Sequence, residues 1–142
     1  MLNLQRKPNK YIYTMEAKFY KCPVCGNVMA VLVDSGVVPV CCGKPMKQLN
    51  PMEQDGALEK HVPVVSRCED GMLKIVVGAQ PHPMTAEHHI AFVAVETPTS
   101  LKVINLDVDK PAQAVYCDCG EKVVAVYEYC NLHGLWKTTT IG

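Results

Sequence analysis

A cysteine and a histidine stand three positions apart in "YCNLHGLW", residues 129–136. Thiolate and imidazole are both metal ligands, so Cys130 and His133 form a candidate pair flanking a turn. Two ligands do not complete a site, because a structural zinc ion usually takes four. The remaining ligands must therefore come from other parts of the chain.

Four cysteines near the start of the chain form two further pairs. "YKCPVCGNVM" holds Cys22 and Cys25 in a C-x2-C arrangement, and "PVCCGKPM" holds the adjacent pair Cys41 and Cys42. Four thiolates this close in sequence fit a tetrahedral site for zinc or iron, and their spacing does not decide between the two metals. Two disulfides, or two unrelated pairs of cysteines, are the alternatives. Adjacent cysteines bind one metal only with a strained backbone, so we expect a distorted tetrahedron.

The histidines stand where expected strands begin or end. They are His61, His82, His88, His89 and His133. A β-sandwich can gather such positions at one edge. Four imidazoles and one thiolate overfill zinc, whereas iron accepts five protein ligands and keeps a sixth position open. His89 should point to the opposite face from His88 if a strand follows, so we expect it not to be a ligand.

The composition excludes several classes of protein. The 142 residues carry 14 basic and 14 acidic side chains, without the basic surplus of a nucleic-acid binder. No stretch approaches the roughly 18 apolar residues of a membrane span, and "MLNLQRKPNKYIYT" lacks the apolar core of a secretory signal. We therefore expect a cytoplasmic protein. Its eight cysteines would stay reduced there, which favours metal ligands over disulfides.

Short β-rich runs separated by turn residues follow from Val62 onward. They include "VPVVSRC", "MLKIVVG", "IAFVAVE", "LKVINLDV" and "KVVAVYEYC", and in the second run Leu73, Ile75 and Val77 share one face. About seven such runs predict a small antiparallel sandwich. No window keeps a 3.6-residue period, and ten prolines argue against long helices. The prediction is an all-β chain with an arm at 1–14, a metal-dependent unit at 15–50 and a sandwich at 51–142.

The motifs together resemble those of the desulfoferrodoxins, the two-iron class of superoxide reductases. The matching pieces are "YKCPVCGNV", "VCCGKPM", "EKHVPV", "PHPM" and "EYCNLHGLWK", which occur in family order within residues 16–138. The resemblance implies a desulforedoxin-like domain followed by an immunoglobulin-like catalytic sandwich. It also implies one-electron reduction of superoxide to hydrogen peroxide in superoxide detoxification, a rubredoxin-like electron donor and a homodimer.

The resemblance assigns a role to each matching residue. Cys22, Cys25, Cys41 and Cys42 would hold the iron of an FeS4 centre. The equatorial ligands of a mononuclear catalytic iron would be His61, His82, His88 and His133, with Cys130 as the axial thiolate. Glu59 would occupy the sixth position in the oxidised resting state, and Lys60 would attract superoxide and position a proton-donating water.

Other interpretations remain open at this level. The chain could be an electron carrier that uses only the FeS4 centre, a zinc-stabilised binding module, or a superoxide dismutase. Three cysteines also lack an assignment, namely Cys68, Cys117 and Cys119. Burial as small apolar residues is the interpretation we favour for them, and a redox or intermolecular thiol role is the alternative.

Overall fold

The computed structural model describes residues 16–55 and 60–142, and every helix or strand assigned there is a β-strand. The all-β prediction is confirmed. The expected arm at 1–14 and Glu59 lie outside the described residues. The chain divides into two compact units, one ending at Gln48 and the other beginning at Leu49. Within the described ranges, no helix is long and apolar enough to cross a membrane.

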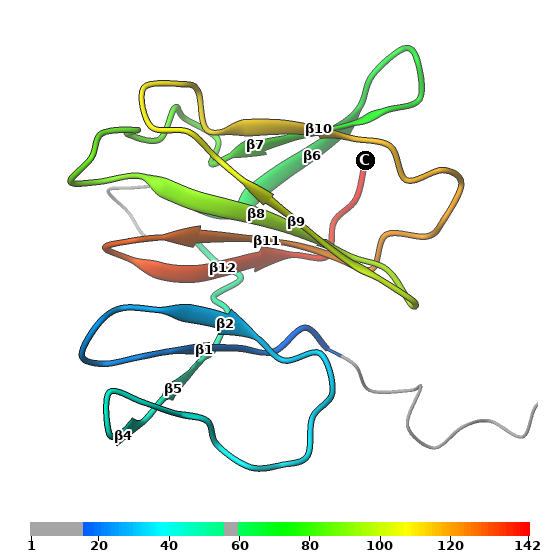
Figure 1. Ribbon diagram of the computed structural model, residues 1–142. Helices are drawn as coiled ribbons and strands as arrows, with labels where there is room; N and C mark the ends of the chain where they lie inside the picture. The colour runs from blue at the N-terminus through cyan, green and yellow to red at the C-terminus, as the bar shows by residue number, and fades with distance from the viewer. Residues whose placement is uncertain (1–15, 56–59) are drawn as a thin grey trace, which may run out of the picture. The chain divides into compact units, whose positions relative to one another are not determined.

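The N-terminal unit has short strands and very little core. Its strands are β1 (Phe19–Lys21), β2 (Val28–Ala30), β3 (Val40–Cys41), β4 (Lys44–Pro45) and β5 (Lys47–Leu49). They form a sheet in the order β2-β1-β5 and a separate β3-β4 hairpin (Figure 1). The buried cluster consists of Tyr20, Cys22 and Met46. So small a core needs a metal or a cross-link to hold it.

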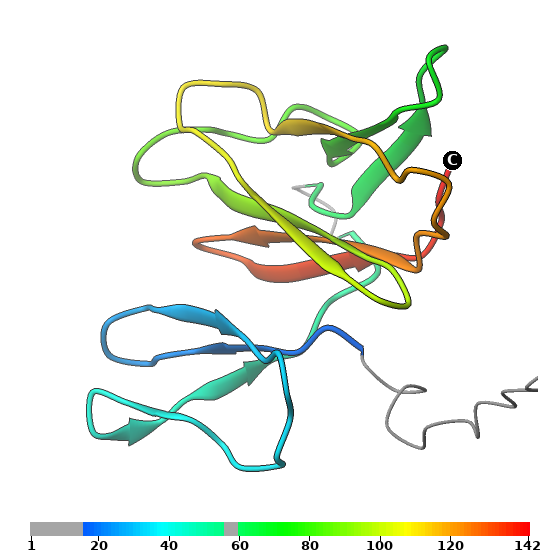
Figure 2. The ribbon, with the colours of Figure 1, turned by 45° about the vertical axis from the view of Figure 1, so that its right-hand side comes forward.

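The C-terminal unit is a two-layered antiparallel sandwich of the immunoglobulin-like class. Its strands are β6 (Pro63–Arg67), β7 (Leu73–Val77), β8 (Ile90–Glu96), β9 (Leu101–Asn105), β10 (Gln113–Tyr116), β11 (Ala125–Cys130) and β12 (Gly134–Thr138). One sheet has the order β10-β7-β6 and the other the order β12-β11-β8-β9. Figures 1 and 2 show these sheets as two stacked layers.

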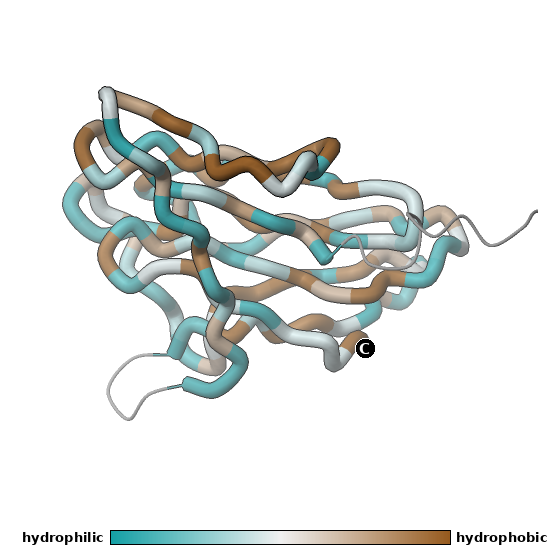
Figure 3. Tube along the Cα trace, turned by 90° about the horizontal axis from the view of Figure 1, so that it is seen from below, coloured by the Kyte–Doolittle hydropathy of each residue, from teal (hydrophilic) through white to brown (hydrophobic). Residues whose placement is uncertain are grey.

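Alternating apolar residues build the core between these two sheets. Leu73, Ile75 and Val77 are fully buried, as their period of two predicts. They pack against residues of the second sheet such as Val93 and Val126. Short apolar and polar stretches alternate along the chain in Figure 3. This packing makes the sandwich a rigid frame for the loops at its ends.

The strand registers bring distant loops to one end of the sandwich. Pro63 at the start of β6 pairs with Val77 at the end of β7. Ile90 at the start of β8 pairs with Cys130 at the end of β11. Val77, Ile90 and Cys130 belong to one core cluster that joins the two sheets. Loops next to these strand ends therefore meet at the same edge.

The preference for burial is wrong for two of the unassigned cysteines. Cys117 and Cys119 are exposed, and Cys68 is partly buried. The reason is that β10 ends at Tyr116, after which Cys119 adopts a left-handed backbone with a φ of 50°. The chain turns there instead of continuing as a strand with one face in the core.

Candidate metal centres

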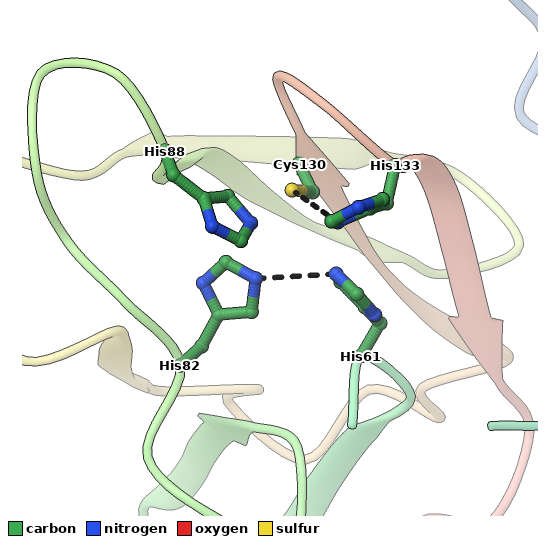
Figure 4. A group of neighbouring side chains, drawn as sticks. All are labelled: His61, His82, His88, Cys130 and His133. Carbon is green, nitrogen blue, oxygen red and sulfur yellow. Dashed lines mark hydrogen bonds between the residues drawn. The ribbon is translucent and has the colours of Figure 1, made fainter. Parts of the chain in front are cut away.

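Five potential ligands meet at the edge where the loops converge. His61 precedes β6, His82 and His88 lie between β7 and β8, Cys130 ends β11, and His133 precedes β12. Their donor atoms all lie within 4.8 Å of one another. Figure 4 shows the five side chains directed into a common space. The structure thus brings together every histidine and cysteine that the resemblance assigns to the catalytic iron.

The four imidazole rings form a closed square. Successive ring centroids lie 4.8, 4.7, 5.0 and 5.0 Å apart around the cycle His61, His82, His88 and His133, and each pair is edge-on. His61 Nε2 and His82 Nε2 lie 3.1 Å apart, and Cys130 Sγ lies 3.7 Å from His133 Nδ1. Four nitrogens and one sulfur in this arrangement suit a metal with more than four ligands and exceed the needs of tetrahedral zinc.

Neighbouring groups fix the orientation of the rings. The carbonyl oxygen of Pro83 lies 2.7 Å from His82 Nδ1, so this nitrogen donates its proton and leaves the Nε2 lone pair for a metal. His61 stacks on Trp136 at 4.6 Å with an interplanar angle of 10°. The Trp136 indole N–H in turn donates to the His133 carbonyl oxygen at 3.2 Å. One tryptophan therefore supports two of the four imidazoles.

Asp55 is a positioning residue that the sequence did not single out. Its Oδ1 accepts hydrogen bonds from the backbone N–H groups of His61 at 2.6 Å and Val62 at 2.8 Å. The carboxylate thereby fixes the chain where it enters β6. In sequence it is one acidic residue among several in "MEQDGALEK", and nothing in that composition indicates a contact six residues away.

Asn131 has a similar role between two ligands. Its Oδ1 accepts from the His89 backbone N–H, and its Nδ2 donates to the Glu87 carbonyl oxygen, both at 2.9 Å. These bonds tie the loop that carries His88 to the turn after Cys130. His89 lies outside the five-residue group, and its Nδ1 donates to the Thr85 carbonyl oxygen at 2.9 Å.

The second group of ligands lies in the N-terminal unit. Cys22, Cys25, Cys41 and Cys42 place their sulfurs within 4.8 Å of one another. The Sγ atoms of Cys25 and Cys41 are 3.7 Å apart, and those of Cys41 and Cys42 are 4.0 Å apart. Cys42 has a φ of 53°, an uncommon value for a residue other than glycine. The adjacent pair reaches one centre through this strained backbone.

The electrostatics of these thiols favour a bound cation. The backbone N–H groups of Cys25 and Val24 donate to Cys22 Sγ at 3.4 Å and lower the pKa of Cys22 to about 6. The neighbouring Cys22 sulfur raises the pKa of Cys41 to about 12. Four sulfurs this close cannot all ionise without a compensating charge, and a metal ion supplies that charge. The two donor sets, one of four sulfurs and one of four nitrogens with a single sulfur, fit two iron centres.

Comparison with known proteins identifies the family. Residues 53–139 match the family model described as Desulfoferrodoxin, and residues 14–49 match that of the desulfoferrodoxin N-terminal domain. The chain belongs to the desulfoferrodoxin family. The desulfoferrodoxin of Nitratidesulfovibrio vulgaris is 44% identical over 131 residues, which cover 92% of this chain and 97% of that protein.

Other relatives extend the match. The desulfoferrodoxin of Syntrophotalea carbinolica is 41% identical over 120 residues, covering 84% of this chain and 93% of that protein. Among solved structures, the superoxide reductase from Treponema pallidum has a TM-score of 0.75 and 28% identity, with 88% of this chain and 99% of that one covered. These desulfoferrodoxin and reductase relatives span both units of the chain.

Glycine is required at one position beside the group of four histidines and Cys130. Gly78 follows β7 with a φ of 75°, and a Cβ there would meet the backbone carbonyl of Lys60. We expect Gly78→Ala to destabilise the unit by more than the roughly 1–2 kcal/mol that a left-handed backbone costs. The clash moves Lys60 and with it His61, so the catalytic iron content should also fall. Thermal unfolding and iron analysis measure the two effects.

Gly71→Ala is the matched control for this substitution. Gly71 has a φ of 83°, and a Cβ there meets nothing within 4 Å. The control therefore carries the backbone cost without the clash. Equal iron loss in both variants would show that the contact with Lys60 does not position His61.

Proposed function

We propose that the protein is a superoxide reductase whose reaction takes place at the group formed by His61, His82, His88, Cys130 and His133. In this reaction superoxide takes up one electron and two protons and leaves as hydrogen peroxide. The square of four imidazoles with a single thiolate is the observation that carries the proposal. The superoxide reductase from Treponema pallidum, which covers 88% of this chain, supports it.

Each part of the site has a proposed task. The five ligands would hold an iron ion, and the chemistry that iron would supply is the transfer of one electron to superoxide. Four imidazoles and one thiolate would give iron five protein ligands, which would leave a sixth position for a small anion. Lys60, next to His61 in sequence, attracts that anion and positions a water that gives up protons. Glu59, which lies outside the described residues, is proposed to occupy the sixth position in the oxidised resting state.

The N-terminal centre is proposed to deliver electrons or to support its unit. Four cysteine ligands fill a tetrahedral metal and leave no position for a substrate, which favours an electron-transfer or structural role. A rubredoxin-like protein is the proposed donor class. The exposed apolar side chains of Leu32, Val33 and Val37 support a homodimer. Cysteine binds a metal only as a reduced thiolate, so the two cysteine-containing ligand groups support a reducing, cytoplasmic location.

The ratio of products tests the proposal. The reduced, iron-loaded protein is mixed with a known amount of superoxide, and hydrogen peroxide and dioxygen are measured together. A reductase yields one peroxide for each superoxide and releases no dioxygen. A dismutase yields half as much peroxide with an equal amount of dioxygen. If superoxide decays no faster with the protein than in buffer alone, the protein is not a superoxide reductase. The electron carrier and the zinc-stabilised binding module would then be the remaining interpretations.

Lys60 gives a separate test of how the anion is attracted. One unit charge at 4 Å contributes about 1 kcal/mol in water, so Lys60→Ala should lower the second-order rate with superoxide about fivefold at low salt. The difference should shrink as ionic strength rises, because salt screens the attraction. Lys74→Ala is the control, since Lys74 is exposed at the second position of β7. Fast-reaction kinetics that gave equal rates for both variants at low salt would contradict this role.

A further inference from the structure

Two of the cysteines outside both metal groups form a thiol pair. The Sγ atoms of Cys117 and Cys119 lie 3.2 Å apart, and both residues are exposed. A disulfide bond is about 2.0 Å long, so a small rotation of the side chains brings these sulfurs to bonding distance. The pair is accessible to a small oxidant in solution.

A folded turn holds the two thiols on the same side. The Asp118 carbonyl oxygen accepts a hydrogen bond from the Glu121 backbone N–H at 2.8 Å, which closes the turn. The Asp118 carboxylate accepts from the Gly120 backbone N–H at 3.2 Å and pairs with Arg67 at 2.8 Å. This ion pair ties the turn to the end of β6. The proximity of the sulfurs thus has a structural basis in the fold.

The surroundings of Cys119 favour its protonated thiol. The interaction of Cys119 with the Cys117 sulfur raises the pKa of Cys119, and the nearby Asp118 and Glu121 carboxylates act in the same direction. Cys119 therefore keeps its proton and can donate it toward Cys117 Sγ. This arrangement leaves Cys117 as the sulfur that starts a reaction and Cys119 as the one that completes it.

The pair lies at the end of the sandwich opposite the catalytic ligands. Tyr116 and Arg67 both pair with Leu73, at the start of β7, whereas His82 follows the end of that strand. Five strand residues span roughly 17 Å. A reaction at Cys117 and Cys119 therefore leaves the metal ligands in place.

We propose that Cys117 and Cys119 are a reversible redox site that hydrogen peroxide oxidises to an intramolecular disulfide. The supply of peroxide during turnover rests on the proposed function, whereas the reactivity of the pair toward added peroxide does not. Hydrogen peroxide, the product of the reductase reaction, would thereby convert the protein from a dithiol to a disulfide form.

The chemistry balances without any further oxidant. The Cys117 thiolate attacks one peroxide oxygen, the O–O bond breaks, and the other oxygen leaves as hydroxide and becomes water with the proton that Cys117 released. Cys117 is then a sulfenic acid. Cys119 Sγ attacks this sulfur, the S–S bond forms, and the oxygen leaves as a second water with the Cys119 proton. The two thiols lose two electrons and peroxide gains them.

Peptide mapping of the full-length, iron-loaded protein tests the proposal. Trypsin releases residues 103–122, a peptide that contains Cys117 and Cys119 and no other cysteine. After one equivalent of hydrogen peroxide and quenching with a thiol alkylator, this peptide should lose both alkylation sites together and become lighter by two hydrogens. Dithiothreitol should restore both sites.

Variants separate this outcome from a general sensitivity to peroxide. Cys119→Ser should stop the reaction at Cys117, where a sulfenic-acid reagent traps it, and Cys68→Ser should leave disulfide formation unchanged. The proposal is overturned if both cysteines of the peptide stay alkylated, or if the disulfide joins two chains. Disulfide formation with added peroxide but none during superoxide turnover would count against the proposed function and leave the redox site standing.

Discussion

Replacing Cys130 by serine is expected to abolish superoxide reduction while leaving the N-terminal metal centre intact. Cys130 is fully buried and provides the only sulfur among the five ligands of the catalytic group. A serine hydroxyl stays protonated near neutral pH and is a harder donor than a thiolate, so it would not replace the charge and electron density of the sulfur. We expect the rate with superoxide to fall at least about 100-fold. Loss of a residue that only supports a metal ligand already costs up to about 100-fold, and Cys130 is itself a proposed ligand.

The visible spectrum and the iron content distinguish this effect from unfolding. The parent protein should show sulfur-to-iron bands from the FeS4 centre and gain a second, broad band at longer wavelength on mild oxidation. Cys130→Ser should keep the first bands and lose the second. Cys68→Ser is the matched control, because Cys68 lies outside both ligand groups. A Cys130→Ser protein that kept the long-wavelength band and the rate would remove Cys130 from the catalytic centre.

Local sequence patterns were sufficient to predict the strands of the β-sandwich. The strands from β6 to β12 coincide with the predicted β-rich runs, and β7 shows the period of two that a half-buried strand imposes on its own sequence. The histidines could be located at strand ends for the same reason. The histidines form one square because of the strand registers, for example the pairing of Pro63 with Val77. The sequence pattern of a single strand does not determine such a register.

The supporting residues could not be predicted because their partners are backbone groups far along the chain. Asp55 accepts from the His61 and Val62 N–H groups, and Asn131 bonds the backbone of a loop 42 to 44 residues away. Any residue has a backbone N–H, so such contacts leave no complementary side chain in the sequence. Gly78 is required for the same reason, since its neighbour is the Lys60 carbonyl group.

The turn at Cys117–Gly120 shows where a periodic pattern fails. If "AVYCDCG" stayed extended, Cys117 and Cys119 would point to the same face, yet the structure ends β10 at Tyr116 and places Cys119 in a left-handed conformation. The ion pair of Asp118 with Arg67 contributes to this turn. A contact between Arg67 and Asp118, which are distant in sequence, thus helps to stabilise the turn. The turn brings the sulfurs of Cys117 and Cys119 together.

Loss of the metal from the N-terminal unit is expected to unfold that unit. The buried cluster of Tyr20, Cys22 and Met46 is small, and full burial of one large apolar side chain contributes only about 1.5–3 kcal/mol. A structural zinc in a comparably small domain contributes roughly 10–16 kcal/mol, so the metal is the larger stabilising factor here. Cys22→Ser removes a ligand whose sulfur also accepts two backbone hydrogen bonds. It should therefore cause the loss of the FeS4 bands and rapid tryptic cleavage within residues 16–48.

The same variant separates the tasks of the two centres. Superoxide decay with a small artificial reductant should persist in Cys22→Ser, because the five ligands of the catalytic group all belong to the other unit. Val24→Ala is the matched control, since this exposed residue lies in the same C-x2-C turn and keeps its backbone N–H bond to Cys22 Sγ. Continued trypsin resistance of Cys22→Ser after complete loss of the FeS4 bands would show that the N-terminal unit folds without its metal. In that case the N-terminal centre would serve electron delivery alone. Cys22→Ser would then be slow only when a rubredoxin-like protein supplies the electrons.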